Sequence, residues 1–176
     1  MKCTSRVVAS EKRKNAVSAG AKRYVQRVQQ DPAYKLKSEL SGAARRVWTG
    51  KQFNTKCSVL ADYTIFKHPL ELVNRLEASA ATGGITRPNG SIDHIIPQDF
   101  YDFTNTDDIA RCWHPENIRI VGLNNNRAKS WSLNCELLQS VPAEAFPLSY
   151  PKNIVLNAAR HDGGKDLYSR HVLSRN

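Results

Sequence analysis

The sequence predicts an α+β protein in which helices surround two short strands. Two short apolar runs, residues 91–96 and 117–121, are each followed by a residue that interrupts strands, Pro97 and Gly122. Longer segments before them repeat apolar residues at the three- and four-residue spacing of amphipathic helices. A polar, asparagine-rich segment follows the second run directly and predicts a helix over residues 124–130.

The first expected helix covers about residues 10–30, with Ser10 as a suitable N-cap. Its apolar residues recur at helical spacing: Val17, Ala21, Tyr24 and Val28. A second helix is expected over residues 31–48, because Asp31 and Pro32 suit the N-cap and first helical positions. Its apolar stripe is Leu36, Leu40, Ala43 or Ala44, and Val47. We interpret both helices as a basic arm, with the alternative that the second belongs to a helical core.

The elements around the two strands follow from shorter signals. A third helix is expected from Pro69 to the glycine pair at residues 83–84. The segment Thr106-Asp107-Asp108 resembles an N-cap followed by first-turn acids, which predicts a short helix reaching Cys112. Beyond residue 131 we expect one short helix ended by Pro142 and a turn at residues 162–164, and this C-terminal extension remains poorly defined.

Positive charge is concentrated near the N-terminus. The chain has a net charge of +10, and residues 1–60 hold 14 Lys and Arg against three acidic residues. A basic block of this density is typical of a protein that binds a polyanion such as nucleic acid. An ordinary charged surface is the alternative. The basic residues expected to contact nucleic acid are Lys12, Arg13, Lys14, Lys22, Arg23, Arg27, Arg45, Arg46 and, later in the chain, Arg127.

Cysteine usage and hydropathy limit the class of protein further. The four cysteines, at positions 3, 57, 112 and 135, are widely scattered, so we expect reduced thiols and no structural zinc. No apolar run approaches the roughly 18 residues of a membrane span. No apolar stretch follows the charged N-terminus, so a secretory signal is not expected. We therefore expect a cytoplasmic protein.

The residues around the two strands form a set suited to phosphodiester hydrolysis. A neutral imidazole is a suitable base near neutral pH, and His94 offers one. The carboxylate of Asp93 and the amide oxygen of Asn126 are the hard ligands that Mg²⁺ or Mn²⁺ accepts. Lys129 lies three residues after Asn126 and shares its helix face, so it can reach a phosphate.

Geometry places conditions on this set. Consecutive strand residues face opposite sides, so Asp93 and His94 serve one site only if the strand ends or twists there. Any of the three asparagines at positions 124–126 can cap the helix, and we favour Asn124 as the cap and Asn126 as the ligand. For His114 we favour loop packing over a role as a second ligand or phosphate contact.

These residues resemble the HNH (ββα-metal) nucleases. The resemblance rests on Asp-His-Ile-Ile-Pro at residues 93–97, on Asn117, and on Asn-Arg-Ala-Lys at residues 126–129. It is closest to phage-encoded endonucleases of the His-Asn-Asn subtype, in which the two asparagines stand nine residues apart, as here. The stretch at residues 112–118 also looks like the family's segment before its middle asparagine, and the likeness is strong over residues 91–130.

The resemblance implies a role for each residue. His94 is then the general base, and Asp93 and Asn126 bind the metal. Asn117 is a structural member of the catalytic set that ties the loop and aims His94. Lys129 assists at the phosphate. The acidic loop between the strands departs from what DNA binding favours.

The resulting expectation is a metal-dependent endonuclease that cleaves double-stranded DNA. The expected divisions are a DNA-binding arm at residues 1–60, a nuclease module at residues 61–131 and an extension at residues 132–176. The resemblance implies a phage or other mobile-element enzyme, of homing or nicking type, acting in a bacterial host cytoplasm. The alternatives are a DNA-binding protein with an inactive module and a nonspecific or RNA-directed nuclease.

Overall fold

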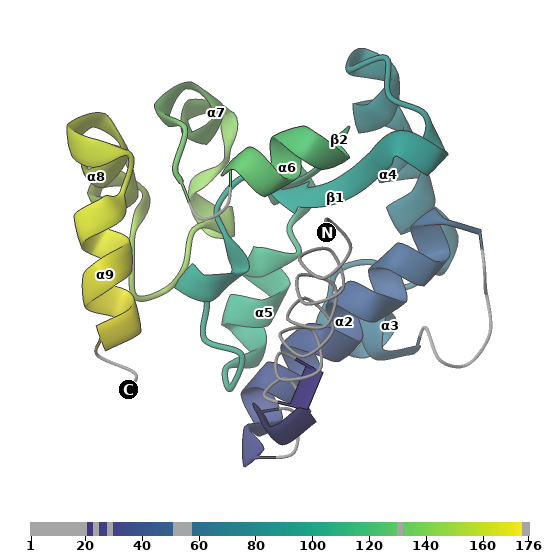
Figure 1. Cartoon of the computed structure of the whole chain (residues 1–176), viewed down its shortest axis with the longest axis horizontal. Coiled ribbons are helices and arrows are strands. Elements are labelled where there is room, and N and C mark those ends of the chain that lie inside the picture. Colours follow the sequence, from purple (N-terminus) through teal and green to yellow (C-terminus); the bar gives the residue numbers. More distant parts are fainter. Residues whose placement is uncertain (1–20, 23–24, 28–29, 51–57, 130–131, 174–176) are drawn as a thin grey trace, which may run out of the picture.

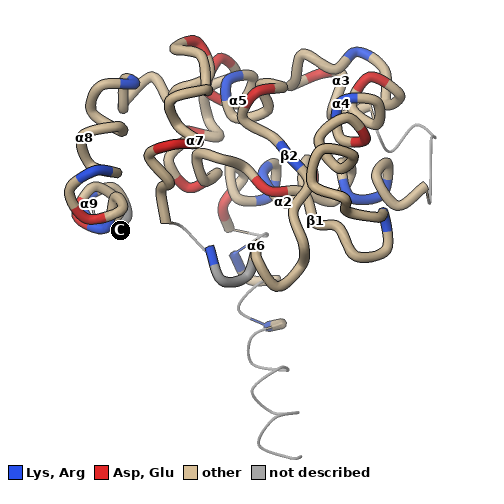
Figure 2. The backbone as a smooth tube through the Cα atoms, turned by 90° about the horizontal axis from the view of Figure 1, so that it is seen from above, with Lys and Arg blue, Asp and Glu red and all other residues tan. Residues whose placement is uncertain are grey.

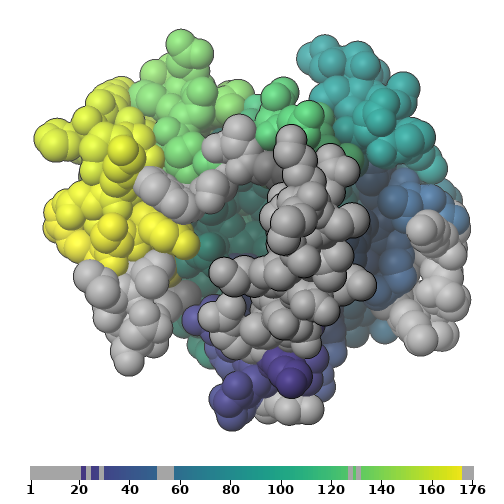
Figure 3. All heavy atoms as spheres, viewed as in Figure 1, coloured from purple at the N-terminus to yellow at the C-terminus, as the bar shows by residue number. Residues whose placement is uncertain are grey.

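A β-hairpin lies between two groups of helices in the computed structural model, which describes residues 21–22, 25–27, 30–50, 58–129 and 132–173. Strands β1 (Gly90–His94) and β2 (Ile118–Gly122) carry the short helix α6 (Leu123–Lys129) (Figure 1). Helices α2 (Pro32–Trp48), α3 (Ser58–Tyr63) and α4 (Pro69–Thr82) lie on one side. The C-terminal helices lie on the other side, as the space-filling view also shows (Figure 3). The described part of the chain is thus an α+β structure, as predicted.

Helix α2 begins and ends where the sequence predicts. The Asp31 carboxylate accepts a hydrogen bond of 3.1 Å from the Tyr34 main-chain N–H, and Pro32 occupies the first turn. Five side chains of α2 are buried in one apolar cluster with side chains of α4, of the hairpin and of the C-terminal region: Leu40, Ala43, Ala44, Val47 and Trp48. This helix therefore belongs to the core, which was the alternative interpretation, and is not an arm. Most of the expected helix over residues 10–30 lies outside the described residues.

Helix α4 covers one side of the hairpin. It starts at Pro69, as predicted, and the His68 imidazole caps it by accepting a bond of 3.2 Å from the Leu70 N–H. It ends before Gly83 and Gly84, and Gly84 adopts the positive φ of 62° that glycine tolerates. The Ser79 hydroxyl accepts the main-chain N–H of Ile120, which joins α4 to β2 directly.

The hairpin is antiparallel, and its register runs from Gly90 opposite Gly122 to His94 opposite Ile118. Strand β1 ends at His94, two residues earlier than predicted, and Gly122 is the last residue of β2 and does not interrupt it. A Cβ atom on Gly90 would lie 2.7 Å from Ile120 Cγ2, so the close approach of the strands requires glycine there.

A long connection, residues 95–117, joins the strands and contains α5 (Thr106–Cys112). Asn105, and not Thr106, caps α5, because its side chain accepts from the N–H groups of Asp107 and Asp108. Two of the acidic side chains are used internally. Asp99 pairs with Lys37 of α2, and Asp108 accepts from two main-chain N–H groups, at residues 102 and 148.

The C-terminal region is helical to a greater extent than the sequence predicts. Helix α7 (Cys135–Ser140) corresponds to the expected short helix and is capped by Asn134. It is followed by α8 (Lys152–Asp162) and α9 (Lys165–Leu173), which form a pair. The predicted turn joins this pair, with Gly163 and Gly164 at φ values of 67° and 83°.

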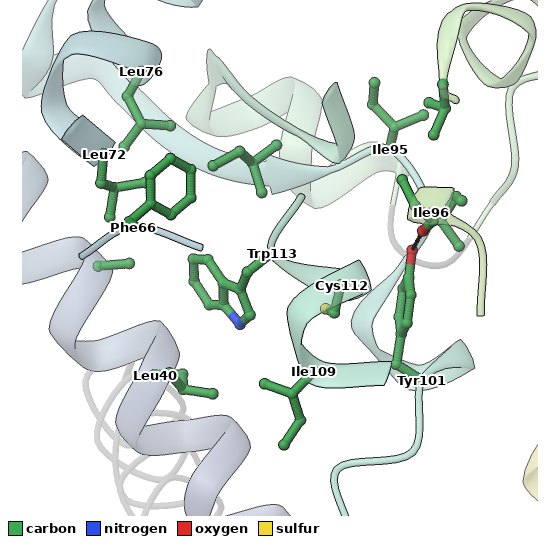
Figure 4. Packing of buried hydrophobic residues seen from close by; sticks show 14 of the residues in the cluster. Leu40, Phe66, Leu72, Leu76, Ile95, Ile96, Tyr101, Ile109, Cys112 and Trp113 are labelled. Atoms are coloured by element: carbon green, nitrogen blue, oxygen red, sulfur yellow. Dashed lines mark hydrogen bonds between the residues drawn. The ribbon is translucent and has the colours of Figure 1, made fainter. Parts of the chain in front are cut away.

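The core is continuous from α2 to α8, with Trp113 at its centre (Figure 4). This side chain is fully buried, and the view shows it between Leu40 of α2, Leu72 of α4 and Ile109 of α5. Cys112 and Cys135 are free thiols, as expected, while the other two cysteines lie outside the described residues. No helix in the described ranges combines the length and apolar character that a bilayer crossing requires.

Candidate active site

Asp93 lies near the end of β1 and forms ion pairs through both of its oxygens. Its carboxylate is 5% exposed. Oδ2 accepts from Arg119 Nε at 3.0 Å, and Oδ1 accepts from Lys129 Nζ at 2.8 Å. Arg119 stands directly opposite Asp93 in the hairpin, while Lys129 comes from the last turn of α6. The predicted metal ligand is therefore a buried carboxylate between two cations.

His94 follows directly but contacts other residues. Its ring meets the edge of Trp113, with ring centroids 4.8 Å apart, and its Nε2 lies 3.3 Å from the side-chain nitrogen of Gln98. With the amide nitrogen as the donor, Nε2 is the acceptor in this contact and the neutral ring carries its proton on Nδ1. Gln98 in turn bonds Ser41 of α2. Helix α2 thus supports the imidazole through Gln98.

The environment of His94 strongly favours the neutral ring. Burial of the imidazole, followed by the positive charges of Lys129 and Lys37, lowers its pKa from 6.5 to about 3. The ring is therefore neutral at pH 7 and can accept a proton. A base with this pKa is weak, however, because proton transfer is favoured by a pKa near the working pH.

Asn117 holds the segment that follows His94. The side chain is completely buried. Its Oδ1 accepts from the Ile96 N–H at 2.8 Å, and its Nδ2 donates to the Cys112 carbonyl at 2.8 Å and to the Tyr101 hydroxyl at 3.1 Å. These bonds tie both ends of the long connection to each other beside the last residue of β1.

Helix α6 places two further candidates against β1. The Asn126 amide nitrogen donates to Ser91 Oγ at 2.9 Å and to the Ile92 carbonyl at 3.1 Å, which leaves its oxygen on the other side of the amide group. The helix begins at Leu123, so Asn124 lies inside it and the assignment of Asn124 as the cap is wrong. The backbone of Arg127 is helical, but its side chain is not among those that the structure describes.

The oxygen atoms around Lys129 are suited to a small, hard cation. Asp93 Oδ1 and the His94 carbonyl both accept from the Lys129 ammonium group, so two oxygen ligands already surround one positive charge. Burial lowers the pKa of Lys129, while Asp93 acts in the opposite direction. Within the described residues no three His, Cys, Asp or Glu side chains form a metal-binding cluster. Mg²⁺ commonly takes only one or two carboxylates, so the donor set fits this cation in kind.

A pocket of about 470 Å³ opens beside His94, between α2 and β1. His94, Gln98 and Trp113 line it, whereas Asp93 and Asn126 do not. The structure therefore brings four candidates of the motif onto one hairpin and its helix, with Asn117 directly before β2, but it does not direct all five into one cavity. His94 faces this pocket, and Asp93 faces α6 and Arg119.

The other predicted residues have varied positions. His114 accepts from the Glu116 N–H and so caps a local turn, in agreement with loop packing. Lys22 is exposed, and the Arg27 guanidinium lies over the Tyr34 ring. Arg45 is exposed and lines the pocket, and Arg46 is half-buried. The remaining residues of the predicted DNA contact lie outside the described residues: Lys12, Arg13, Lys14 and Arg23.

The contacts of three residues in this region were not predicted from the sequence, which favoured a phosphate contact or surface charge for Arg119. Arg119 pairs with Asp93, Gln98 contacts His94, and Arg87 lines the pocket. The pairing of Arg119 with Asp93 follows once the strand register is known, because an antiparallel hairpin with Gly90 opposite Gly122 places Arg119 across from Asp93. Comparison with protein-family models, with curated proteins and with solved structures finds no match to this chain.

Proposed function

We propose that this protein is a metal-dependent DNA endonuclease whose active site is built on the β1–β2 hairpin and α6. One observation supports the proposal above the others. Asp93 and Lys129 lie 36 positions apart in the sequence and are in direct contact. Asn126 forms a hydrogen bond to the same strand. The hairpin and helix that carry them have the strand–strand–helix order of the nuclease family that the motif resembles.

Each residue has a task in this proposal. His94 accepts the proton of the attacking water, since its ring is neutral at pH 7. Asn117 keeps the chain after His94 in place through its three short hydrogen bonds. Lys129 stabilises negative charge on the phosphate. The products are a 5′-phosphate and a 3′-hydroxyl, by analogy with the family.

Asp93 and Asn126 would hold the divalent cation, Mg²⁺ or Mn²⁺. When bound, such a cation neutralises charge on the phosphate and on the leaving oxygen. Both oxygens of Asp93 accept from cationic side chains, and a cation bound to this carboxylate would repel the Lys129 ammonium group. A Lys129 ammonium group displaced in this way would be available to the substrate phosphate.

A second candidate function is DNA binding without cleavage. It is favoured by the same contacts: both oxygens of Asp93 are paired, and the Nε2 lone pair of His94 is directed at Gln98. In this alternative the hairpin and α6 are a structural unit, stabilised by an internal ion-pair cluster in place of a metal. The two candidates differ in one measurable property, the cleavage of DNA.

Conversion of supercoiled plasmid to open-circle or linear forms tests the proposal. Purified protein is incubated with plasmid and Mg²⁺ or Mn²⁺, beside an EDTA control. We expect cleavage that is lost in EDTA and in His94→Ala, while His161→Ala, a change at an exposed histidine of α8, cleaves normally. Plasmid that is retarded on a gel but never cleaved would support the second candidate instead. Equal cleavage by His94→Ala and by the wild type would remove His94 from the mechanism.

The biological role proposed is that of a phage or mobile-element enzyme in a bacterial host, of homing or nicking type. This part rests on the sequence resemblance alone. A single active site in a monomer is expected to nick one strand, so open-circle product is the first form expected in the plasmid assay. Linear product without an open-circle intermediate would indicate that two active sites act together.

A further inference from the structure

The pocket between α2 and β1 has features that the proposed catalytic residues do not account for. Its walls come mainly from α2, from the turn at Arg87–Asn89 that precedes β1, and from β1 itself, with further residues from the long connection and from α6. At about 470 Å³ it falls within the range of roughly 300–1,000 Å³ that is typical of small-ligand sites. His94 belongs to its lining, so whatever enters the pocket reaches the proposed base.

The charge of the pocket suits an anion. Among the described residues that line it, Arg45 and Arg87 are cationic and none is acidic. Lys37 and Lys129 add positive charge close enough to affect the His94 ring. Figure 2 shows Lys and Arg on α6 and beside β1, whereas acidic residues gather around α5. An anionic substrate group is therefore attracted to the His94 side of the hairpin.

Arg87 is held in place before any ligand arrives. Its guanidinium group pairs with Glu77 of α4 and lies over the Trp48 ring, 5.4 Å from the centroid. Both contacts restrict the side chain at the rim of the pocket, which reduces the entropic cost when it binds a ligand. Arg45 is exposed and lines the same pocket from α2.

The pocket also contains neutral polar groups. Ser38 and Ser41 of α2 line it together with Gln98, and Ser41 and Gln98 bond each other. Arginine forks and hydroxyl groups are the usual contacts to phosphate oxygens, and such contacts fix the position of a nucleic-acid strand without reading its sequence. The combination of two arginines, hydroxyl donors and an adjacent base candidate matches one ligand class, a phosphodiester backbone.

We propose that one strand of the DNA substrate runs through this pocket past His94, with Arg45 and Arg87 binding its phosphates. This inference rests on the proposed function. It makes α2 a wall of the active site, whereas the sequence alone assigned this helix to a separate arm. Arg45 and Arg87 are positioning residues for the substrate strand.

The test is the salt dependence of duplex binding in EDTA, measured by fluorescence anisotropy with a labelled DNA duplex of mixed sequence. Removal of one phosphate-binding side chain should lower the slope of log Kd against log salt by about one between roughly 50 and 200 mM. We expect this for Arg45→Gln and for Arg87→Gln, with Kd raised about tenfold at low salt. Arg87→Lys keeps the charge and should retain the slope.

Lys35→Gln is the matched control, because Lys35 is exposed on the same helix but does not line the pocket. It removes the same charge and should leave the slope unchanged. Thermal melting of each variant checks that it is folded. If Arg87→Gln does not fold, the salt slope of Arg45→Gln tests the inference. Arginine variants whose slopes match that of Lys35→Gln would overturn the inference.

The plasmid assay separates this result from the proposed function. Wild-type cleavage together with unchanged slopes in both arginine variants would leave the nuclease proposal standing and remove the pocket from it. The expected slope changes without any wild-type cleavage would show that the pocket binds DNA while the nuclease proposal fails. A wild-type protein that neither binds nor cleaves the duplex would overturn both.

Discussion

Replacement of Asn117 by alanine is the sharpest test of how the hairpin and its long connection are held together. The side chain is completely buried and makes three hydrogen bonds of 3.1 Å or less. Alanine removes all three and leaves two buried main-chain groups, the Ile96 N–H and the Cys112 carbonyl, without this partner. The Tyr101 hydroxyl still donates to the Ala145 carbonyl, so its loss is smaller.

The expected cost follows from these contacts. A buried donor or acceptor that loses its partner costs about 1–3 kcal/mol, so two of them and a small cavity give a total of about 3–5 kcal/mol. For a chain of this size 1 kcal/mol corresponds to about 2–4 °C in Tm, so we expect Tm to fall by about 10 °C. Guanidinium unfolding of wild type and variant at one pH measures the difference.

Asn134→Ala is the control for this measurement. Asn134 is exposed and caps α7 through one hydrogen bond of 3.1 Å to the Leu137 N–H. Loss of such a cap costs about 1 kcal/mol. A destabilisation by Asn117→Ala no greater than that of Asn134→Ala would refute the reasoning, because it would show that water or a shifted backbone replaces the buried bonds.

Three further predictions concern the same hairpin. Gly90→Ala should destabilise the protein by about 1–3 kcal/mol, because its Cβ would lie 2.7 Å from Ile120. Gly122→Ala should cost less, because the nearest neighbour of its Cβ would be 3.9 Å away. Equal losses of stability in the two variants would contradict the close approach at Gly90. The free energy of unfolding should fall as the pH drops below about 6.5, by up to about 1.4 kcal/mol per pH unit. The reason is that His94 is protonated in the unfolded chain below this pH, whereas in the folded protein it stays neutral until about pH 3. His94→Asn should flatten this slope. Asp93→Ala should cost more than Lys129→Met, because it leaves two partly buried cations without their carboxylate, and urea unfolding of both variants gives the order.

The helices with clear end signals could be predicted from the sequence. Asp31 and Pro32 at the start of α2 and Pro69 at the start of α4 act through local hydrogen bonds and backbone angles, so their effect is visible in a few neighbouring residues. The two strands were also predicted, to within two residues. Helices α8 and α9 were not, because no side-chain cap marks the start of α8 and both helices are stabilised by packing against each other and against the core.

The role of α2 shows why composition alone misleads. The surplus of Lys and Arg over residues 1–60 suggested that this helix belongs to a basic arm on the nuclease module, and Arg45 and Arg46 make its last turn basic. The opposite face of the helix is buried against α4 and around Trp113, and a sequence pattern cannot show what an apolar stripe packs against. The same helix can carry basic residues outward and close the core inward.

The candidate site was predictable as a set of residues but not as a geometry. The motif correctly brings Asn126 and Lys129 of α6 to β1, since a short helix that follows β2 directly has few places to pack. The partners of Asp93 and His94 depend on the strand register and on the path of the long connection. Arg119 and Gln98 therefore became visible only in the structure.

The electrostatics of Asp93 unite the structural and the proposed chemical roles of the hairpin. A buried carboxylate without a partner is costly, and here two cations from β2 and α6 compensate it. A divalent cation at Asp93 would bring a third positive centre to the same carboxylate and would repel the Lys129 ammonium group. Metal binding is therefore expected to weaken the ion pair that stabilises α6 against β1. Burial already lowers the pKa of Lys129, and Asp93 acts in the opposite direction, so the charged ammonium group depends on this carboxylate. Stability of this helix and activity of the proposed site are therefore expected to oppose each other at Lys129.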